Sequence, residues 1–196
     1  MARYCVTGGA GFIGSNIVRR LLAENHEVRV VDNFVTGLRA NLKGLDVDLV
    51  EGDLCDVGVA EAACEGVDHV LHQAALGSVP RSVDDPARTN HNNTQSTINL
   101  IVAACKHNVK TFVYASSASI YGGGEPNTKH EALSPAPANP YAVSKLAAEE
   151  YVKNAWPVYG LRTVSVRYFN VYGPRQSPEG AYAAVVPLFV KAALNG

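Results

Sequence analysis

The chain has 196 residues, of which 47% are apolar, so it can bury the core of one good-sized domain or slightly more. Its formal net charge is −1 without any basic block, which argues against a nucleic-acid or membrane-surface role, and its apolar runs are far shorter than the roughly 20 residues of a membrane span. We expect no signal peptide and no metal site, and the cysteines (Cys5, Cys55, Cys64, Cys105), which lack C-x-x-C spacing, indicate reduced structural thiols and a cytoplasmic setting.

The first expected elements form a strand, a tight turn and a helix within residues 4–14. A short apolar run ends in a glycine cluster with glycines at Gly8, Gly11 and Gly14. In a dinucleotide-binding turn, the first glycine permits the sharp bend and the second lets a pyrophosphate approach the backbone. The third glycine allows the helix to pack closely. A glycine pattern alone is weak evidence, so its surroundings decide the interpretation.

Those surroundings favour a dinucleotide site. A helix expected over Phe12 to Ala23 offers the N–H groups of Phe12 and Ile13 to phosphates. A second strand, Glu27 to Val31, ends in Asp32, 18 residues past the last glycine. An acid at this position accepts the ribose hydroxyls and repels a 2′-phosphate, which favours NAD over NADP. The alternative is that this acid is only a polar strand end.

Two more strand and helix units follow. We expect a strand over Val47 to Val50, a helix over Val57 to Cys64 and a strand over His69 to His72. Asp53 either caps the helix or reaches the adenine amino group, and both possibilities stay open. His72 is interpreted as a satisfied histidine at a strand end rather than a catalytic group, because neither an acid nor a nucleophile lies beside it in the sequence.

The next segment alternates small and polar residues. Gln73-Ala74-Ala75 places small side chains where a backbone passes close to a cofactor, and the loop Leu76 to Asp85 is a candidate substrate contact. Asp85-Pro86 indicates an N-cap followed by a first-turn proline, so a helix is expected to His107. Within that helix, Asn99 is expected to be exposed.

Hydroxyl groups gather after the next strand, Thr111 to Ala115. Ser116, Ser117 and Ser119 follow it directly, and ligands of open parallel sheets lie beyond the carboxyl ends of strands. These hydroxyls are therefore a candidate site, although an ordinary serine-rich turn has the same composition. A long loop rich in glycine and proline separates them from the next helix.

The remaining elements complete an α/β pattern. A helix starts at Asn139-Pro140 and is expected to end near Trp156-Pro157, a strand covers Leu161 to Arg167, and a last helix covers Ala181 to Leu194. Alternating apolar strands and amphipathic helices predict a doubly wound parallel sheet, the Rossmann-type NAD-binding fold. We assign residues 1–175 to this domain and residues 176–196 to the start of a substrate-binding region that is largely missing.

Tyr141 and Lys145 are four residues apart and therefore share one helix face. The pair gains weight from its place on the helix that follows the serine-bearing strand. A phenol with a pKa of about 10 is a poor base at neutral pH, but an ammonium and a positive nicotinamide ring favour the phenolate. Lowering that pKa by about 3 units requires about 4 kcal/mol. A serine hydroxyl opposite the phenol would orient the reacting oxygen.

These motifs make the chain resemble an extended short-chain dehydrogenase/reductase, and within that family a nucleotide-sugar 4-epimerase acting on UDP-glucose or UDP-N-acetylglucosamine. The resemblance covers essentially the whole chain. The matching segments are residues 7–14, Asp32-Asn33, residues 52–54, 72–75 and 116–122, Tyr141-Ala142-Val143-Ser144-Lys145 and residues 167–173, with residues 76–82 and 180–187 resembling enzymes of UDP-N-acetylhexosamines.

The resemblance implies an NAD-dependent, cytoplasmic homodimer acting on a UDP-sugar. It implies that Ser117, Tyr141 and Lys145 are catalytic. It places the cofactor on Gly8, Gly11, Phe12, Ile13, Gly14, Asp32, Asn33, Asp53, Leu54, Gln73, Ala74, Ala75, Asn93, Tyr141, Lys145 and Tyr168. It places the substrate on Gly77, Ser78, Ser117, Ser119, Tyr141, Asn170, Ala184 and Val185.

Two departures from the family pattern matter. Ser96 replaces a frequent glycine on the cofactor side, and the later residues that clamp the uridine diphosphate are missing. Either the chain is part of a longer enzyme or its substrate binding is compromised. The alternatives are a 4-reductase, a dehydratase, or an NAD-binding module without turnover. The resemblance counts against a dehydratase, because Ala118-Ser119 stands where that family has an Asp-Glu pair.

Overall fold

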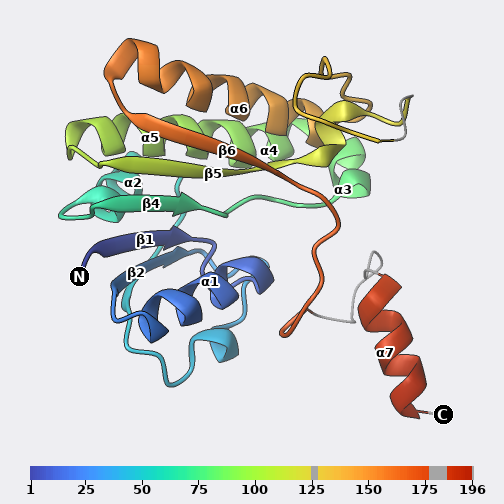
Figure 1. Cartoon of the computed structure of the whole chain (residues 1–196), viewed down its shortest axis with the longest axis horizontal. Coiled ribbons are helices and arrows are strands. Elements are labelled where there is room, and N and C mark those ends of the chain that lie inside the picture. The colour runs from blue at the N-terminus through green and yellow to red at the C-terminus, as the bar shows by residue number, and fades with distance from the viewer. Residues whose placement is uncertain (125–127, 177–184, 196) are drawn as a thin grey trace.

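The computed structural model describes residues 1–124, 128–176 and 185–195, and within them six parallel strands form one sheet (Figure 1). The strand order is β3-β2-β1-β4-β5-β6. The chain order reverses between β1 and β4, which is where open α/β sheets bind ligands. The strands are β1 (Arg3–Thr7), β2 (Glu27–Asp32), β3 (Asp48–Glu51), β4 (His69–His72), β5 (Thr111–Ser117) and β6 (Arg162–Tyr168).

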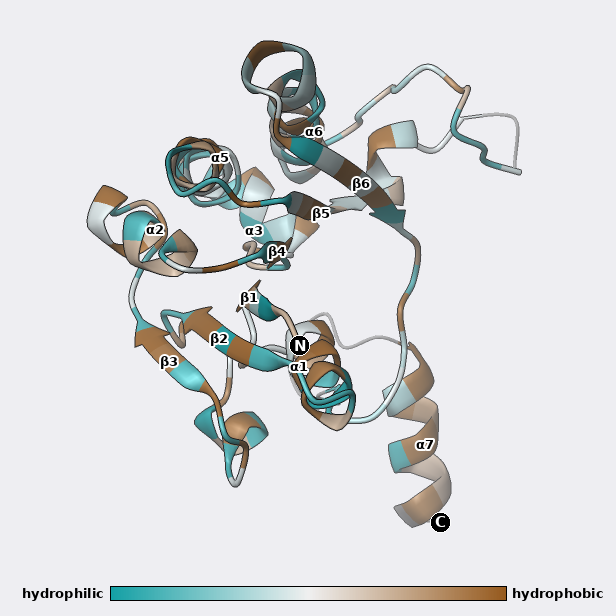
Figure 2. Cartoon of the chain, turned by 60° about the vertical axis from the view of Figure 1, so that its left-hand side comes forward, coloured by the Kyte–Doolittle hydropathy of each residue, from teal (hydrophilic) through white to brown (hydrophobic). Residues whose placement is uncertain are grey.

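Helices cover both faces of this sheet, so the predicted doubly wound fold is confirmed (Figure 2). Neighbouring residues of β1 point to opposite faces: Cys5 belongs to the core under α2, α5 and α6, and Val6 belongs to the core under α1. The helices are α1 (Phe12–Ala23), α2 (Val57–Cys64), α3 (Val79–Asp84), α4 (Pro86–Asn90), α5 (Ser96–Lys106), α6 (Pro140–Tyr159) and α7 (Val185–Asn195), with single turns η1 (Arg39–Leu42), η2 (His91–Gln95) and η3 (Ala118–Tyr121).

Local capping explains where several helices begin. Asp85 accepts a hydrogen bond from the Arg88 N–H at 2.9 Å, and Asn139 accepts one from the Ala142 N–H at 2.9 Å. Both predicted caps are therefore confirmed. No helix in the described parts of the chain is both long enough and apolar enough to cross a membrane.

Three predictions about local structure were wrong. The loop Leu76 to Asp85 contains α3, because Ser78 accepts a hydrogen bond from the Arg81 N–H at 3.3 Å and caps the helix. Helix α6 continues past Pro157 and ends at Tyr159, because the following residue, Gly160, adopts a left-handed conformation (φ 74°). The helix expected from Pro86 to His107 is interrupted by η2, a π-helical turn.

Asn99 was also wrongly expected to be exposed. It is half-buried, and its amide donates hydrogen bonds to the Leu54 and Cys55 carbonyls, both at 3.0 Å. The two carbonyls precede α2, so this side chain ties α5 to the loop that carries Asp53.

All four cysteines are free thiols, and Cys5 and Cys64 are buried.

Candidate active site

The glycine turn after β1 is built by close backbone contacts. Gly8 adopts φ +64°, and a Cβ there would lie 2.9 Å from the Ala74 backbone. A Cβ on Gly14 would lie 2.2 Å from the Gly8 carbonyl oxygen, so only glycine lets α1 lie this close to the turn. The predicted roles of Gly8 in the sharp turn and of Gly14 in the close packing of the helix therefore have a direct geometric basis.

Helix α1 presents free backbone donors beside this turn. Its first intrahelical bond runs from the Ser15 N–H to the Gly11 carbonyl at 3.0 Å. The N–H groups of Phe12, Ile13 and Gly14 precede that bond and have no helical acceptor. All three residues line one cavity of about 390 Å³, so the donors lie where an anionic group can be bound.

Two acids also line this first cavity. Asp32, at the end of β2, is 7% exposed and accepts hydrogen bonds from the Ala10 N–H at 2.9 Å and the Phe34 N–H at 2.8 Å. These bonds fix the orientation of its carboxylate. The remaining lone pairs of the carboxylate can accept hydroxyl groups, and its charge repels a phosphate.

Asp53 is the second acid, and it does not cap α2. That cap is Asp56, which accepts a hydrogen bond from the Gly58 N–H at 2.7 Å. Asp53 instead accepts bonds from the Cys55 N–H at 2.9 Å and the Asn33 amide at 3.2 Å. Burial raises the pKa of Asp53, but the bonds from Cys55 and Asn33 outweigh it and hold the pKa below its usual range.

A second cavity, of about 480 Å³, lies beyond the carboxyl ends of β5 and β6. It shares residues with the first cavity, so the two lie side by side along the sheet edge. The shared lining consists of Phe12, Ile13, Gln73, Ala75 and Gly77. The second cavity is also lined by Ser117, Tyr141, Lys145, Tyr168, Asn170 and Val185.

The predicted triad therefore lines a single cavity. Ser117 ends β5, and its hydroxyl accepts hydrogen bonds from the Ser119 N–H at 3.2 Å and the Ser119 hydroxyl at 2.8 Å. Tyr141 lies in the first turn of α6. Burial raises the pKa of its phenol, while the nearby Ser117 hydroxyl acts in the opposite direction. Ser117 and Tyr141 are thus placed to contact the same bound group.

Lys145 is the most buried charged group of the site. It is 3% exposed, and its Nζ lies 4.5 Å from the centre of the Tyr114 ring. Burial lowers the pKa of Lys145 to about 7, and the charge of Glu149 opposes this. The ammonium faces an aromatic ring rather than water, so its charge acts strongly on nearby groups.

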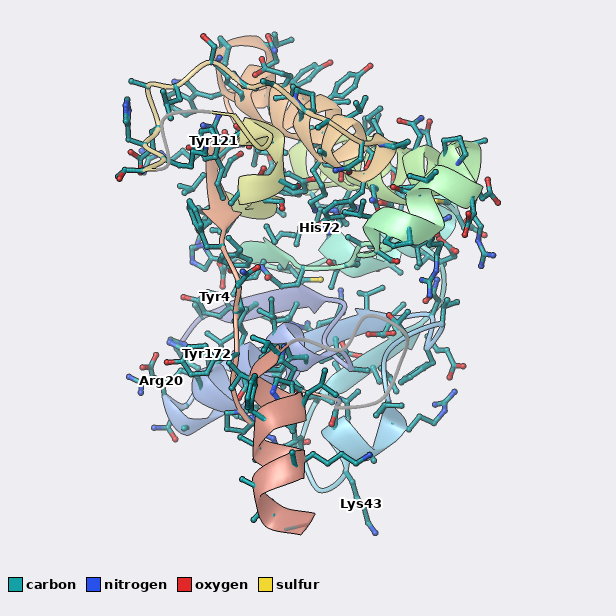
Figure 3. All side chains as sticks on the ribbon, turned by 90° about the vertical axis from the view of Figure 1, so that its right-hand side faces the viewer. Tyr4, Arg20, Lys43, His72, Tyr121 and Tyr172 are labelled. Atoms are coloured by element: carbon teal, nitrogen blue, oxygen red, sulfur yellow. The ribbon has the colours of Figure 1, made fainter. Side chains whose placement is uncertain are left out.

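His72 lies inside the fold between β4 and the helices that cover it (Figure 3). Its Nδ1 pairs with the Thr7 hydroxyl at 2.7 Å, and its Nε2 pairs with the Thr97 hydroxyl at 3.0 Å. Burial, with a smaller effect from Lys145, lowers the pKa of His72 to about 3. The interpretation of His72 as a satisfied histidine at a strand end is confirmed.

Several predicted contacts lie away from both cavities. Asn93 is 1% exposed; its amide accepts from the Leu76 N–H at 2.7 Å and donates to the Ser144 hydroxyl at 3.0 Å, so it supports the cavity wall from behind. Ser78 caps α3, and Ser119 contacts Ser117 rather than lining the cavity. Ala184 lies outside the described residues.

The other predicted residues line the cavities. Those in the first cavity are Gly8, Gly11, Gly14, Asp32, Asn33, Asp53, Leu54 and Ala74. Sequence reasoning did not predict that Asn92, Val35 and Thr36 line the first cavity, or that Phe169, Val171, Tyr172, Gln176 and Val186 line the second. Asn92 and Ser96 are four apart on one helix face, a spacing that could have revealed them.

Comparison with known proteins finds one matching family. Residues 4–196 match the model of the NAD dependent epimerase/dehydratase family. The chain is 38% identical over 200 residues to a UDP-glucose 4-epimerase of Mycolicibacterium smegmatis, covering 99% of this chain and 64% of that protein.

Solved structures give the same result. The chain superposes on a UDP-N-acetylglucosamine 4-epimerase of Methanobrevibacter ruminantium with a TM-score of 0.94 and 39% identity, covering 100% of this chain and 63% of that one. It superposes on the dTDP-glucose 4,6-dehydratase DesIV of Streptomyces venezuelae, solved with NAD bound, with a TM-score of 0.89 and 36% identity, covering 99% of this chain and 62% of that one. The chain thus spans less than two thirds of each of these relatives.

Proposed function

Because the chain belongs to the NAD dependent epimerase/dehydratase family, we propose that its protein is a UDP-hexose 4-epimerase that uses NAD. The observation that carries this proposal is the position of Ser117, Tyr141 and Lys145 in one cavity. That cavity shares a wall with the cavity beside the glycine turn. A sugar in the second cavity would therefore lie against a dinucleotide in the first.

The residues of the first cavity fit NAD: they offer backbone N–H donors, two acids, and glycines that let a ligand approach the backbone. The N–H groups of Phe12 and Ile13 would hold the pyrophosphate, Asp32 the adenosine ribose, and Asp53 with Leu54 the adenine. Lys145 and Tyr168 would hold the nicotinamide side. When bound, NAD supplies a reversible hydride acceptor and a positive ring charge, so the reaction has no net oxidation.

The triad can then perform the proton transfers. Tyr141 takes the proton of the C4 hydroxyl, and the Ser117 hydroxyl donates a hydrogen bond to the same oxygen. Lys145 stabilises the phenolate that Tyr141 must form, since an opposite charge favours the ionised state. The 4-keto sugar turns over in the cavity, and Tyr141 returns the proton to the oxygen on the other face.

The relatives and the second cavity support the proposed substrate class. Gly77, Asn170 and Val185 line that cavity. Ser78 follows Gly77 in the chain, Ala184 precedes Val185, and the Ser119 hydroxyl contacts Ser117. The two epimerase relatives are named for UDP-glucose and UDP-N-acetylglucosamine. We propose that this protein accepts one or both pairs of epimers.

The test uses the full-length protein that carries this chain, purified and supplied with UDP-glucose and, separately, UDP-N-acetylglucosamine. The expected result is conversion of at least one of them to its C4 epimer without consumption of added NADH. Tyr141→Phe should lower kcat by about 100-fold or more, since it removes the acid/base group. Tyr4→Phe is the matched control, because Tyr4 lies on β1 and lines neither cavity. Unchanged activity in Tyr141→Phe would rule out the assigned base.

Two rival activities remain within the family. A 4,6-dehydratase has support from the similarity to DesIV, but Ala118 and Ser119, the residues after Ser117, cannot supply an acid and a base for C5 and C6. A dehydratase would release water and change the substrate mass, and a 4-reductase would consume NADH stoichiometrically. A module without turnover would bind NAD in calorimetry and leave both UDP-sugars unbound.

We also propose that the protein is a homodimer through α5 and α6. These helices expose Val102, Tyr151, Val158 and Tyr159 beside a cavity of about 490 Å³. Tyr151→Glu should turn a dimer into a monomer in light scattering, whereas Leu38→Glu, which is exposed next to η1 and α1, should not. The four free thiols suit the reducing cytoplasm, where we place the protein.

A further inference from the structure

A buried ion pair lies directly behind the catalytic cavity, on the same helix as Tyr141 and Lys145. Glu149 is 6% exposed. Its carboxylate accepts hydrogen bonds from the Arg167 guanidinium, with Nη2 at 2.7 Å and Nε at 3.0 Å from Oε1. The Ser116 hydroxyl donates to the other carboxylate oxygen. Sequence reasoning gave none of these contacts a role.

The partners of Glu149 are next to site residues in the chain. Ser116 immediately precedes Ser117 at the end of β5, and Arg167 immediately precedes Tyr168 at the end of β6. In the sheet register Ser116 pairs with Arg167, and Ser117 pairs with Tyr168. A single carboxylate therefore joins the two strand ends that form the floor of the cavity.

Arg167 extends this cluster to η3. Its Nη1 donates to the Tyr121 hydroxyl at 2.8 Å, and its guanidinium carbon lies 4.9 Å from the centre of the Tyr121 ring, which Figure 3 labels. Tyr121 ends the turn that carries Ser119. Hydrogen bonding to Glu149 raises the pKa of Arg167, so Arg167 stays charged.

Glu149 also faces Lys145, since the two are four residues apart on the buried side of α6. Within the described parts of the chain, the other titratable groups facing Lys145 are Tyr141 on α6, Tyr114 on β5 and His72 on β4. Burial keeps all three uncharged at neutral pH. Among these groups, Glu149 alone supplies a negative charge.

We propose that Glu149 is a positioning residue: it joins the strand ends that carry Ser117 and Tyr168, and with Arg167 it sets the charge that Lys145 carries. This proposal rests on the proposed function, in which Lys145 acts on Tyr141. Glu149 itself lines neither cavity and needs no contact with the sugar. Its effect depends on the balance between the Glu149 anion and the Arg167 cation. Removing the anion and removing the cation should therefore shift the pKa of Lys145 in opposite directions.

The experiment measures the titration of Lys145 by NMR in the 196-residue chain labelled with ¹³C-lysine. The resonance of Lys145 is assigned by its absence in Lys145→Met. In Glu149→Gln the pKa of Lys145 should fall by about 1 unit, because the anion is gone and Arg167 remains. In Arg167→Gln it should rise by about 1 unit, because the anion remains without its partner. Glu150→Gln, the next residue and exposed, is the matched control and should change nothing.

A merely structural role would move the pKa of Lys145 in the same direction in both variants, or in neither, and either result would overturn the proposal. If Glu149→Gln does not fold, the rise in Arg167→Gln still decides the question. The titration involves neither NAD nor sugar. A protein that fails to epimerise UDP-sugars but shows the two opposite shifts would refute the proposed function, while the effect of Glu149 and Arg167 on Lys145 would still be established.

Discussion

Burial of the Lys145 ammonium in the candidate active site should lower the stability of the folded chain. Its pKa falls from 10.5 to about 7, and each pKa unit corresponds to about 1.4 kcal/mol. Between these two values the unfolded chain binds more protons than the folded chain, so this contribution to stability rises with pH. The resulting penalty is about 4 kcal/mol at pH 7 and about 2 kcal/mol at pH 9.

Lys145→Met removes this penalty. The free energy of unfolding of the variant minus that of the wild type should therefore fall by about 2 kcal/mol between pH 7 and pH 9. Loss of the contact with the Tyr114 ring adds a term that does not change with pH, so the slope is the diagnostic quantity. The cysteine thiols titrate in both proteins and cancel in the difference.

Urea unfolding followed by circular dichroism, at several pH values, measures this difference. Lys153→Met is the matched control, because Lys153 lies on α6 with its side chain 74% exposed and should give a flat difference. A flat difference for Lys145→Met as well would refute the reasoning. It would mean that the ammonium is solvated in the folded chain.

Three further predictions follow from the geometry. Gly14→Ala should destabilise the chain by about 1–3 kcal/mol and abolish NAD binding in calorimetry, because its Cβ would lie 2.2 Å from the Gly8 carbonyl oxygen, whereas Gly123→Ala meets no atom within 4 Å and should be neutral. Because the pKa of His72 is lowered to about 3, the unfolded state binds one more proton than the folded state between pH 6.5 and 3. The free energy of unfolding should therefore decrease through that window as the pH is lowered, and His72→Gln should make the decrease smaller. Asn99→Ala should lower the free energy of unfolding by about 1–3 kcal/mol in urea, since two carbonyls lose their donor. The control Asn154→Ala, on the exposed side of α6, should lower it by less than about 0.5 kcal/mol. Equal losses would show that the two hydrogen bonds of Asn99 contribute nothing.

The features that the sequence predicted well are those fixed by neighbours in the chain. The caps at Asp85 and Asn139 act within three residues of themselves, and the close contact at Gly14 is made with the Gly8 carbonyl of the same turn. The alternation of strands and helices then determines which strand ends meet at the same edge of the sheet. That edge brings Ser117 and Tyr141 to one cavity, although 24 positions separate them.

The features that the sequence did not predict depend on partners far along the chain. Asn99 looks like a solvated helix residue until the Leu54 carbonyl is placed against it. Asn93 is a polar residue of the kind that contacts ligands, yet its amide forms hydrogen bonds with the Leu76 backbone and the Ser144 hydroxyl instead. Glu149 follows Lys145 by one turn, but its importance appears only when β6 delivers Arg167.

In the proposed mechanism, the phenol of Tyr141 contacts the C4 oxygen of a sugar lying against the nicotinamide. A crystal structure of the full-length protein with NAD and a UDP-hexose tests it most directly. We predict that the Tyr141 hydroxyl lies within about 2.6–3.2 Å of that oxygen and that the Ser117 hydroxyl contacts the same atom. A Tyr141 ring turned to bulk water, with the sugar bound elsewhere, would contradict it.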